Sequence, residues 1–211
     1  MTLLEEVTSP DLKRLVHDGV TTAVIPFGSV EYQGRHLPLG ADALLADAVG
    51  RAVADRLNAV VAPTVRVGFA DEHMHGAGTL SVPADTLCDV ATHIAHSLIA
   101  HGFRVLALVS IHGGNRAAIE QAVHDLRARR RDVIVCAPQG DLGPAPGRHS
   151  GKWLTSVMLA LRPDLVHIDA ASEDLRFELR EANAETGAAN LEHFVSSIVQ
   201  QVRRAVQGPS Q

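Results

Sequence analysis

The sequence has few residues of the kinds that mark disulfide-rich secreted proteins or base-stacking nucleic-acid-binding proteins. It contains two cysteines, and aromatic residues make up 3% of the chain. Cys88 and Cys136 fall in a predicted helix and a predicted strand, which is typical of packed thiols in a reduced, cytoplasmic protein. The scarcity of aromatic residues argues against a platform on which bases stack.

Long apolar runs and an excess of positive charge are also missing. No stretch reaches the roughly 20 apolar residues of a membrane span, and Met1 to Glu6 does not resemble the start of a signal peptide. There are 19 Lys and Arg against 24 Asp and Glu, a net charge of -5. The basic run from Arg127 to Arg131 ends a predicted helix, where cations suit the helix dipole, so we interpret it as a solvated helix end. We therefore expect no membrane and no nucleic-acid partner.

Apolar segments alternate with helical patterns along the 211 residues. Continuous apolar runs predict four strands, at 21–27, 59–67, 103–111 and 132–137. Apolar residues three and four positions apart predict helices that begin at Ser9 and that span 42–57, 83–100, 115–129, 151–161 and 186–206. Strands of this kind are buried on both faces, and their alternation with helices predicts an α/β protein, a three-layer α/β/α sandwich with a mostly parallel central sheet. We expect one domain over residues 1–211.

Imidazoles and carboxylates gather in the four segments that follow the predicted strands. Ligands of such sheets bind beyond the carboxyl ends of the strands. Imidazole and carboxylate groups are ligands of borderline divalent metals, and a charged cluster without a counter-ion is costly to desolvate. The pattern predicts a metal site there, from five of the twelve histidines (His36, His73, His75, His112 and His149) and two carboxylates (Glu31 and Asp42).

Two other interpretations of these segments are weaker. The glycines of His112-Gly113-Gly114-Asn115 could cradle a phosphate at a helix N-terminus, but the sequence has no Walker lysine and no G-x-G-x-x-G pattern. Ser29 could be a nucleophile, but Gly28-Ser29-Val30 lacks the flanking residues of a nucleophile elbow.

Four motifs, in this order, resemble the creatininase family of metal-dependent amidohydrolases. The resemblance covers about residues 5 to 166, and the subgroup associated with mycofactocin maturation is the most similar in style. The motifs are Pro26-x-Gly28-Ser29-x-Glu31-x-x-Gly34-x-His36-Leu37-Pro38-Leu39-Gly40-x-Asp42, His73-x-x-Gly76-x-Gly78-Thr79-Leu80-Ser81, Ser110-x-His112-Gly113-Gly114-Asn115 and His149-Ser150-Gly151-x-x-Leu154-Thr155-Ser156-x-Met158-Leu159.

The resemblance implies an α/β sandwich, often oligomeric, with a two-metal site that activates water to open an amide bond. Glu31, Asp42 and His112 match the first-metal ligands of the family. His149 matches a catalytic histidine, so the expected catalytic residues are His149, as acid and base, and Glu31. Four further side chains are expected to orient ligands or substrate, namely Gln33, His36, His73 and Asn115.

The sequence departs from the family at the second metal. Gln33 stands where the family has a histidine ligand, and Leu154 stands where it has a glutamate. The family's C-terminal stretch is also missing, so the part from about residue 167 is expected to be shortened, with 176–189 in its place. Both losses affect one ion, which predicts a single tightly bound divalent metal (Zn, Mn or Fe) per chain, unless Glu72 or Asp141 substitutes.

The expected function is that of a cytoplasmic, homo-oligomeric amidohydrolase that cleaves a cyclic or linear amide C–N bond of a small molecule or peptide. One alternative is a degenerate, non-hydrolytic member that binds a small molecule or serves as a partner subunit. Another is a different biosynthetic reaction, such as condensation or isomerisation.

Overall fold

The computed structural model describes residues 1–144 and 147–208. In these residues, five strands form one sheet in the order β1-β3-β2-β4-β5, and every pair of neighbours is parallel. The prediction of a parallel central sheet is therefore confirmed. The strands are β1 (Thr2–Leu3), β2 (Thr22–Phe27), β3 (Val60–Val61), β4 (Val105–Ser110) and β5 (Ile134–Cys136).

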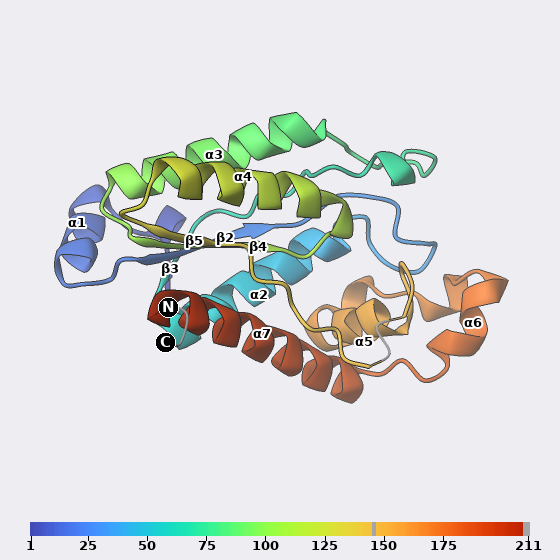
Figure 1. Ribbon diagram of the computed structural model, residues 1–211. Helices are drawn as coiled ribbons and strands as arrows, with labels where there is room; N and C mark the ends of the chain where they lie inside the picture. Colours follow the sequence, from blue (N-terminus) through green and yellow to red (C-terminus); the bar gives the residue numbers. More distant parts are fainter. Residues whose placement is uncertain (145–146, 209–211) are drawn as a thin grey trace.

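Helices cover both faces of the sheet, as the sequence predicts (Figure 1). One face is covered by α3 (Ala84–Ala100) and α4 (Arg116–Arg129), and the other by α2 (Ala41–Leu57) and α7 (Ala184–Gln207). Helix α5 (Lys152–Leu161) packs against α7. Helices α1 (Ser9–His17) and α6 (Glu173–Leu179) lie at opposite ends of the molecule in this view.

The core follows the two-residue period of the strands. Ile25 and Phe27 of β2 are fully buried in a cluster with residues of α3 and α4, such as Leu87. Val24, which precedes Ile25 and points to the opposite face, is buried in a second cluster with residues of α2 and α7, such as Val49. Because side chains of a strand point alternately to its two faces, one apolar strand supplies both layers.

The structure corrects some of the predicted boundaries. The predicted strand 59–67 pairs only at Val60–Val61, because Pro63 has no N–H to donate and the chain beyond it makes only an isolated bridge at Val65. Strand β1 and helix α6 were not predicted. They have two and seven residues, too few to carry a recognisable period.

The topology brings four polar segments to one end of the sheet. Strands β2 and β4 are neighbours and end at paired residues, Phe27 and Ser110, so the loops that follow them start side by side. Helix α2 begins at Ala41, at the end of the loop after β2, and α5 begins directly after residues 147–151. The carboxyl ends of the strands therefore hold the segments in which the sequence places its candidate site.

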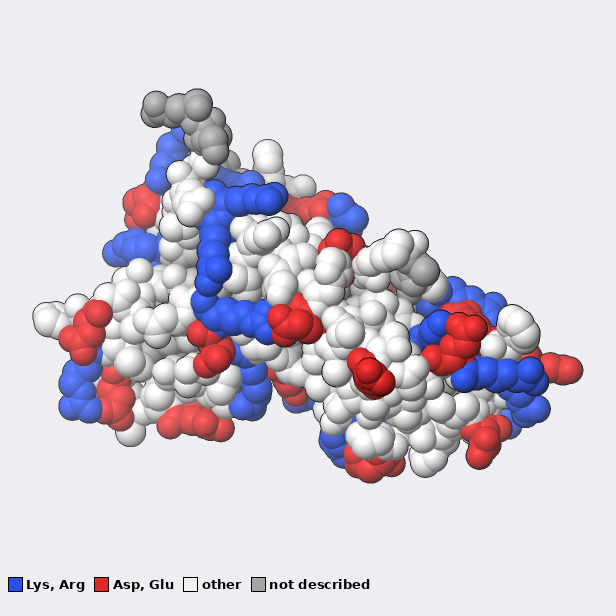
Figure 2. Space-filling model, turned by 90° about the horizontal axis from the view of Figure 1, so that it is seen from below, with Lys and Arg blue, Asp and Glu red and all other residues white. Residues whose placement is uncertain are grey.

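Two features of the surface bear on possible partners. Within the described residues, no helix has the length and apolar character that a membrane crossing requires. Basic and acidic side chains are interspersed on the face that Figure 2 shows, so this face carries no extended patch of one sign.

Candidate metal centre

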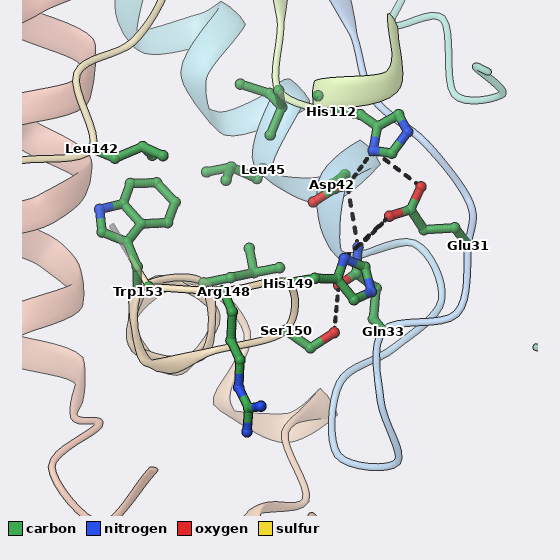
Figure 3. Close-up of a pocket in the computed structure, with 14 residues that line it drawn as sticks. Glu31, Gln33, Asp42, Leu45, His112, Leu142, Arg148, His149, Ser150 and Trp153 are labelled. Carbon is green, nitrogen blue, oxygen red and sulfur yellow. Dashed lines mark hydrogen bonds and ion pairs between the residues drawn. The ribbon is translucent and has the colours of Figure 1, made fainter. Parts of the chain in front are cut away.

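Glu31, Asp42 and His112 converge at the carboxyl ends of β2 and β4 (Figure 3). The Nδ1 atom of His112 lies 3.1 Å from Oε2 of Glu31 and 3.5 Å from Oδ2 of Asp42. All three residues are buried, and their candidate ligand atoms lie within 4.8 Å of one another. Metal–ligand bonds of about 2.0–2.2 Å put two ligand atoms of a tetrahedral ion ~3.4 Å apart. The spacing therefore suits one divalent cation.

The ring of His112 is held in the orientation that a metal ligand needs. Its Nε2–H donates a hydrogen bond of 2.9 Å to the carbonyl of Phe69, which leaves Nδ1 directed at the two carboxylates. Metal-binding histidines almost always donate their other ring N–H in this way, because the bond fixes the tautomer and the ring plane.

Asn115 connects the loops that carry these groups. Its side chain is fully buried, accepts a 2.9 Å hydrogen bond from the N–H of Phe69 and donates one of 2.9 Å to the carbonyl of Gly28. Since Phe69 also accepts from His112, Asn115 fixes the residue that orients the imidazole. Asn115 was expected to orient ligands or substrate, and its contacts reach the ligand His112 only through the backbone of Phe69.

Asp42 lies in the first turn of α2, where the helix dipole favours a carboxylate. Its Oδ2 accepts hydrogen bonds from Oγ of Ser29, at 2.9 Å, and from Nε2 of Gln33, at 3.2 Å. The approach of this loop to α2 requires Gly28, because a Cβ there would lie 2.6 Å from the backbone of Ala43. The sequence analysis weighed Ser29 only as a nucleophile, and no motif predicted its hydrogen bond to Asp42.

Gln33 is placed between the two carboxylates. Besides its bond to Asp42, Nε2 donates to Oε1 of Glu31 at 3.1 Å, while its Oε1 accepts from Oγ of Ser150 at 3.0 Å. Ionised carboxylates only accept, so the amide nitrogen must face them. Gln33 therefore links Glu31 to Asp42 and does not present its oxygen to a cation at this point.

The electrostatics of the cluster fit a bound cation. Burial, followed by the charge of Asp42, raises the pKa of Glu31 to about 7. Burial opposes a charged His112 ring, but the hydrogen bond with Asp42 and the charge of Glu31 raise the pKa of His112 overall. Oε2 of Glu31 is buried and has no hydrogen-bond partner among the described residues. A buried carboxylate oxygen without a donor is costly, and a divalent cation would satisfy it.

His73 and His149 lie on the other side of Glu31. Nε2 of His73 is 3.5 Å and Nδ1 of His149 is 3.7 Å from Oε1 of Glu31, and the two rings stack with centroids 4.0 Å apart. Burial, followed by the charge of His149, lowers the pKa of His73. The loop of His73 is fixed by Thr79, whose hydroxyl donates to the carbonyl of His73 and accepts from the N–H of Tyr32.

Three residues of the predicted site lie outside the cluster around Glu31 or at its edge. His36 is buried but directed to Oγ1 of Thr155, at 3.0 Å, and burial lowers its pKa. Asp141 is an exposed residue whose carboxylate binds His193 of α7 at 2.9 Å, because it follows the edge strand β5. The structure therefore does not bring Asp141 to the cluster. Glu72 is exposed, with its Oε1 3.3 Å from Nε2 of His73.

A pocket of about 240 Å³ opens over the cluster. One side is polar and includes the cluster, and the other side is apolar. The guanidinium of Arg148 points away from Glu31, toward Asp174 and Glu178 (Figure 3). The apolar side was not predicted as part of the site and consists of Leu45, Ile111, Leu142, Trp153 and Leu154.

Comparison with known proteins identifies the family. The model of the creatininase family, described as creatinine amidohydrolase, matches residues 5–179. The chain belongs to the creatininase family. The resemblance inferred from the four motifs is thereby confirmed, and the match extends beyond the last of them.

Two relatives have names that describe hydrolases. The mycofactocin precursor peptide peptidase of Mycobacterium ulcerans is 38% identical over 160 residues, 71% of this chain and 62% of its own length. The creatinine amidohydrolase of Pseudomonas putida is 32% identical over 191 residues, 78% of this chain and 73% of its own length. The chain thus spans about three-fifths of the length of this mycofactocin relative.

Solved creatininases share the fold. A creatinine amidohydrolase crystal structure superposes with a TM-score of 0.84 at 25% identity, covering 100% of this chain and 99% of the other. A structure named for creatininase with Mn has a TM-score of 0.79 at 27% identity, covering 99% of each chain. A mutant creatininase named as a Zn-Zn type has a TM-score of 0.79 at 26% identity, covering 99% of this chain and 98% of the other.

Proposed function

We propose that this chain is a metal-dependent amidohydrolase that cleaves an amide C–N bond in a small molecule or a peptide. The observation that carries the proposal is the convergence of Glu31, Asp42 and His112 on one buried point in a member of the creatininase family. The names of the two curated relatives describe hydrolysis of creatinine and of a precursor peptide. Nothing in the comparisons favours the non-hydrolytic alternative.

Glu31, Asp42 and His112 would hold the cation. A divalent ion at such a site supplies Lewis acidity and lowers the pKa of a bound water to about 7 in well-studied enzymes. Ser29 and Gln33 hold the carboxylate of Asp42, and the carbonyl of Phe69 holds the ring of His112. Hydrogen bonds from such neighbours tune the basicity of the ligands.

His149 is the proposed proton carrier. Its Nε2–H donates to the carbonyl of Tyr32 at 2.8 Å, so Nδ1 is the nitrogen that takes up or releases a proton. Nδ1 faces Glu31 at the polar side of the pocket, and the side chain is 37% exposed, so the ring reaches both the cluster and a substrate. The amide nitrogen of the substrate would receive the proton from His149 as it leaves. The apolar side of the pocket would hold the carbon skeleton of the substrate.

The identity of the metal and the number of ions per chain are part of the same proposal. Zn, Mn and Fe all accept the mixed nitrogen and oxygen donors of this cluster. We propose one tightly bound ion per chain, because Gln33 donates to the carboxylates and Leu154 offers an apolar side chain at the positions where the family has second-metal ligands. A homo-oligomeric state and a cytoplasmic location stay predictions.

The test is hydrolysis by protein reconstituted with Zn²⁺ or Mn²⁺, with creatinine as the cyclic amide and the mycofactocin precursor peptide as the linear one. We expect turnover of one of them, lost in His112→Ala. The control is His124→Ala, which removes an exposed imidazole on α4 and should leave turnover unchanged. Circular dichroism melting checks that both variants fold. Full turnover in folded His112→Ala, or none of either amide by metal-loaded parent protein, would overturn the proposal.

A further inference from the structure

The segment that carries His149 is packed around a single carboxylate. Glu178, in α6, accepts a 2.7 Å hydrogen bond at its Oε1 from the backbone N–H of Lys152, and its Oε2 lies 3.6 Å from Nε of Arg148. A Cβ on Gly151 would lie 2.7 Å from this Oε1 and 2.7 Å from the carbonyl oxygen of Arg148, so the close approach requires glycine. Residues on both sides of His149 therefore contact Glu178.

Glu178 also supplies the cap that α5 lacks. Gly151 precedes this helix and has no side chain that could accept from the free N–H groups of its first turn. The carboxylate of Glu178 accepts from the N–H of Lys152, at the helix end where the dipole favours negative charge. Hydrogen bonds to a charged group are stronger than those between neutral groups. This bond therefore fixes where α5 begins, three residues after His149.

The backbone beside His149 needs support from its surroundings. Ser150, the next residue, has a φ of 55°, and a residue with a side chain keeps such a left-handed conformation only where its neighbours hold it. Oγ of Ser150 donates to Oε1 of Gln33 at 3.0 Å, on the side of the metal cluster. Arg148, the preceding residue, points away from the cluster and donates to the carbonyl of Asp174 in α6 at 2.8 Å (Figure 3). His149 is thus held between the cluster and α6.

We propose that Glu178 is a positioning residue that keeps His149 over the candidate metal centre. The role rests on the proposed hydrolysis, in which His149 carries the proton. Nδ1 of His149 lies 3.7 Å from Oε1 of Glu31, and its Nε2–H donates to the carbonyl of Tyr32 at 2.8 Å. A shift of the segment by about 1 Å would disturb both contacts, and a misplacement of that size can lower a rate about 100-fold. Glu178 lies in 176–189, the segment expected in place of the family's C-terminal stretch.

The test compares Glu178→Ala with a matched control, Glu181→Ala. The control removes the exposed carboxylate that pairs with Nζ of Lys152. With the amide that the parent protein hydrolyses, creatinine or the mycofactocin precursor peptide, Glu178→Ala should lower kcat about 10- to 100-fold, and Glu181→Ala should keep it. Zn²⁺ affinity, measured by chelator competition, should stay close to that of the parent in both variants, because the segment holds none of the three proposed metal ligands.

A conservative variant separates positioning from a general loss of stability. Glu178→Gln keeps an oxygen that can accept from the N–H of Lys152, although it loses the charge that faces Arg148. It should recover most of the kcat that Glu178→Ala loses. A Glu178→Gln protein as slow as a folded Glu178→Ala protein would contradict the role of this hydrogen bond and overturn the proposal.

A second measurement does not depend on hydrolysis. Diethyl pyrocarbonate modifies accessible imidazoles, and mass spectrometry of the peptides gives the rate at His149, with the exposed His124 of α4 as internal reference. In metal-free protein this rate should rise several-fold in Glu178→Ala, because the released segment exposes the ring, and stay at the parent value in Glu181→Ala.

The outcomes separate this proposal from the proposed function. Equal modification rates at His149 in Glu178→Ala and Glu181→Ala, or a parent-like kcat in folded Glu178→Ala, would overturn it. If circular dichroism shows that Glu178→Ala does not fold, Arg148→Ala removes the contact from the other side and should raise the same rate, and an unchanged rate would overturn the proposal. Absence of hydrolysis by the metal-loaded parent protein would overturn the proposed function, and the modification rate would still decide whether Glu178 holds His149.

Discussion

The buried side chain of Asn115 gives a quantitative test of how the loops hold the candidate metal centre. It links the carbonyl of Gly28 to the N–H of Phe69, and Phe69 in turn orients His112. Asn115→Ala removes both hydrogen bonds at once without touching either carboxylate. We therefore expect two effects from this substitution, one on the stability of the metal-free protein and one on its affinity for metal.

The expected loss of stability follows from the two groups that are left unpaired. A buried donor or acceptor without a partner costs about 1–3 kcal/mol, so the two together lower the free energy of unfolding by roughly 2–6 kcal/mol. For a chain of about 200 residues this corresponds to a fall in Tm on the order of 10 °C. Metal affinity should fall by about 10-fold or more, because the carbonyl that orients His112 is released.

The assay is urea unfolding of the metal-free protein, with Zn²⁺ affinity measured by chelator competition. The control is Gln121→Ala, which removes an exposed amide on α4, the helix that begins directly after Asn115; this amide bonds to Asp125. We expect this control to cost less than about 0.5 kcal/mol. Equal stability of the Asn115→Ala and Gln121→Ala proteins would refute the positioning argument, and unchanged Zn²⁺ affinity would refute its link to His112.

Two further predictions concern the site and its scaffold. Ser29→Ala should lower the affinity for the bound metal ion about 10- to 100-fold, because it removes a hydrogen bond to the carboxylate of Asp42. Chelator competition measures this affinity, and an unchanged value would contradict the prediction. Gly187→Ala should lower the free energy of unfolding by about 1–3 kcal/mol despite the better helix propensity of alanine, because a Cβ would lie 1.8 Å from the carbonyl of Ser156. In the same urea titration Gly113→Ala, whose Cβ meets open space, should be close to neutral.

The order of polar residues along the chain was enough to predict that Glu31, Asp42 and His112 lie together at one edge of the sheet. Glu31 and His112 follow neighbouring parallel strands, whose carboxyl ends meet at one edge of the sheet. Asp42 falls in the first turn of the next helix, at the same edge. These relations depend on strand and helix periods, which a single sequence displays clearly.

The paths of the loops could not be predicted in the same way. Asp141 follows a strand like the other candidates, but β5 is at the edge of the sheet and the residue pairs with α7. Thr79 brings His73 beside Tyr32 through two hydrogen bonds between loops distant in sequence. Such contacts between loops decide which imidazoles lie beside each carboxylate oxygen of Glu31. Periodicity shows which strand or helix a residue follows, but it does not show which side chains the residue contacts.

The most direct test of the account is a crystal structure of the protein grown with Zn²⁺, with anomalous data collected on both sides of the zinc absorption edge. The account predicts a strong anomalous peak about 2.0–2.2 Å from side-chain atoms of Glu31, Asp42 and His112. Zinc bound elsewhere in the protein, with no peak among Glu31, Asp42 and His112, would contradict it.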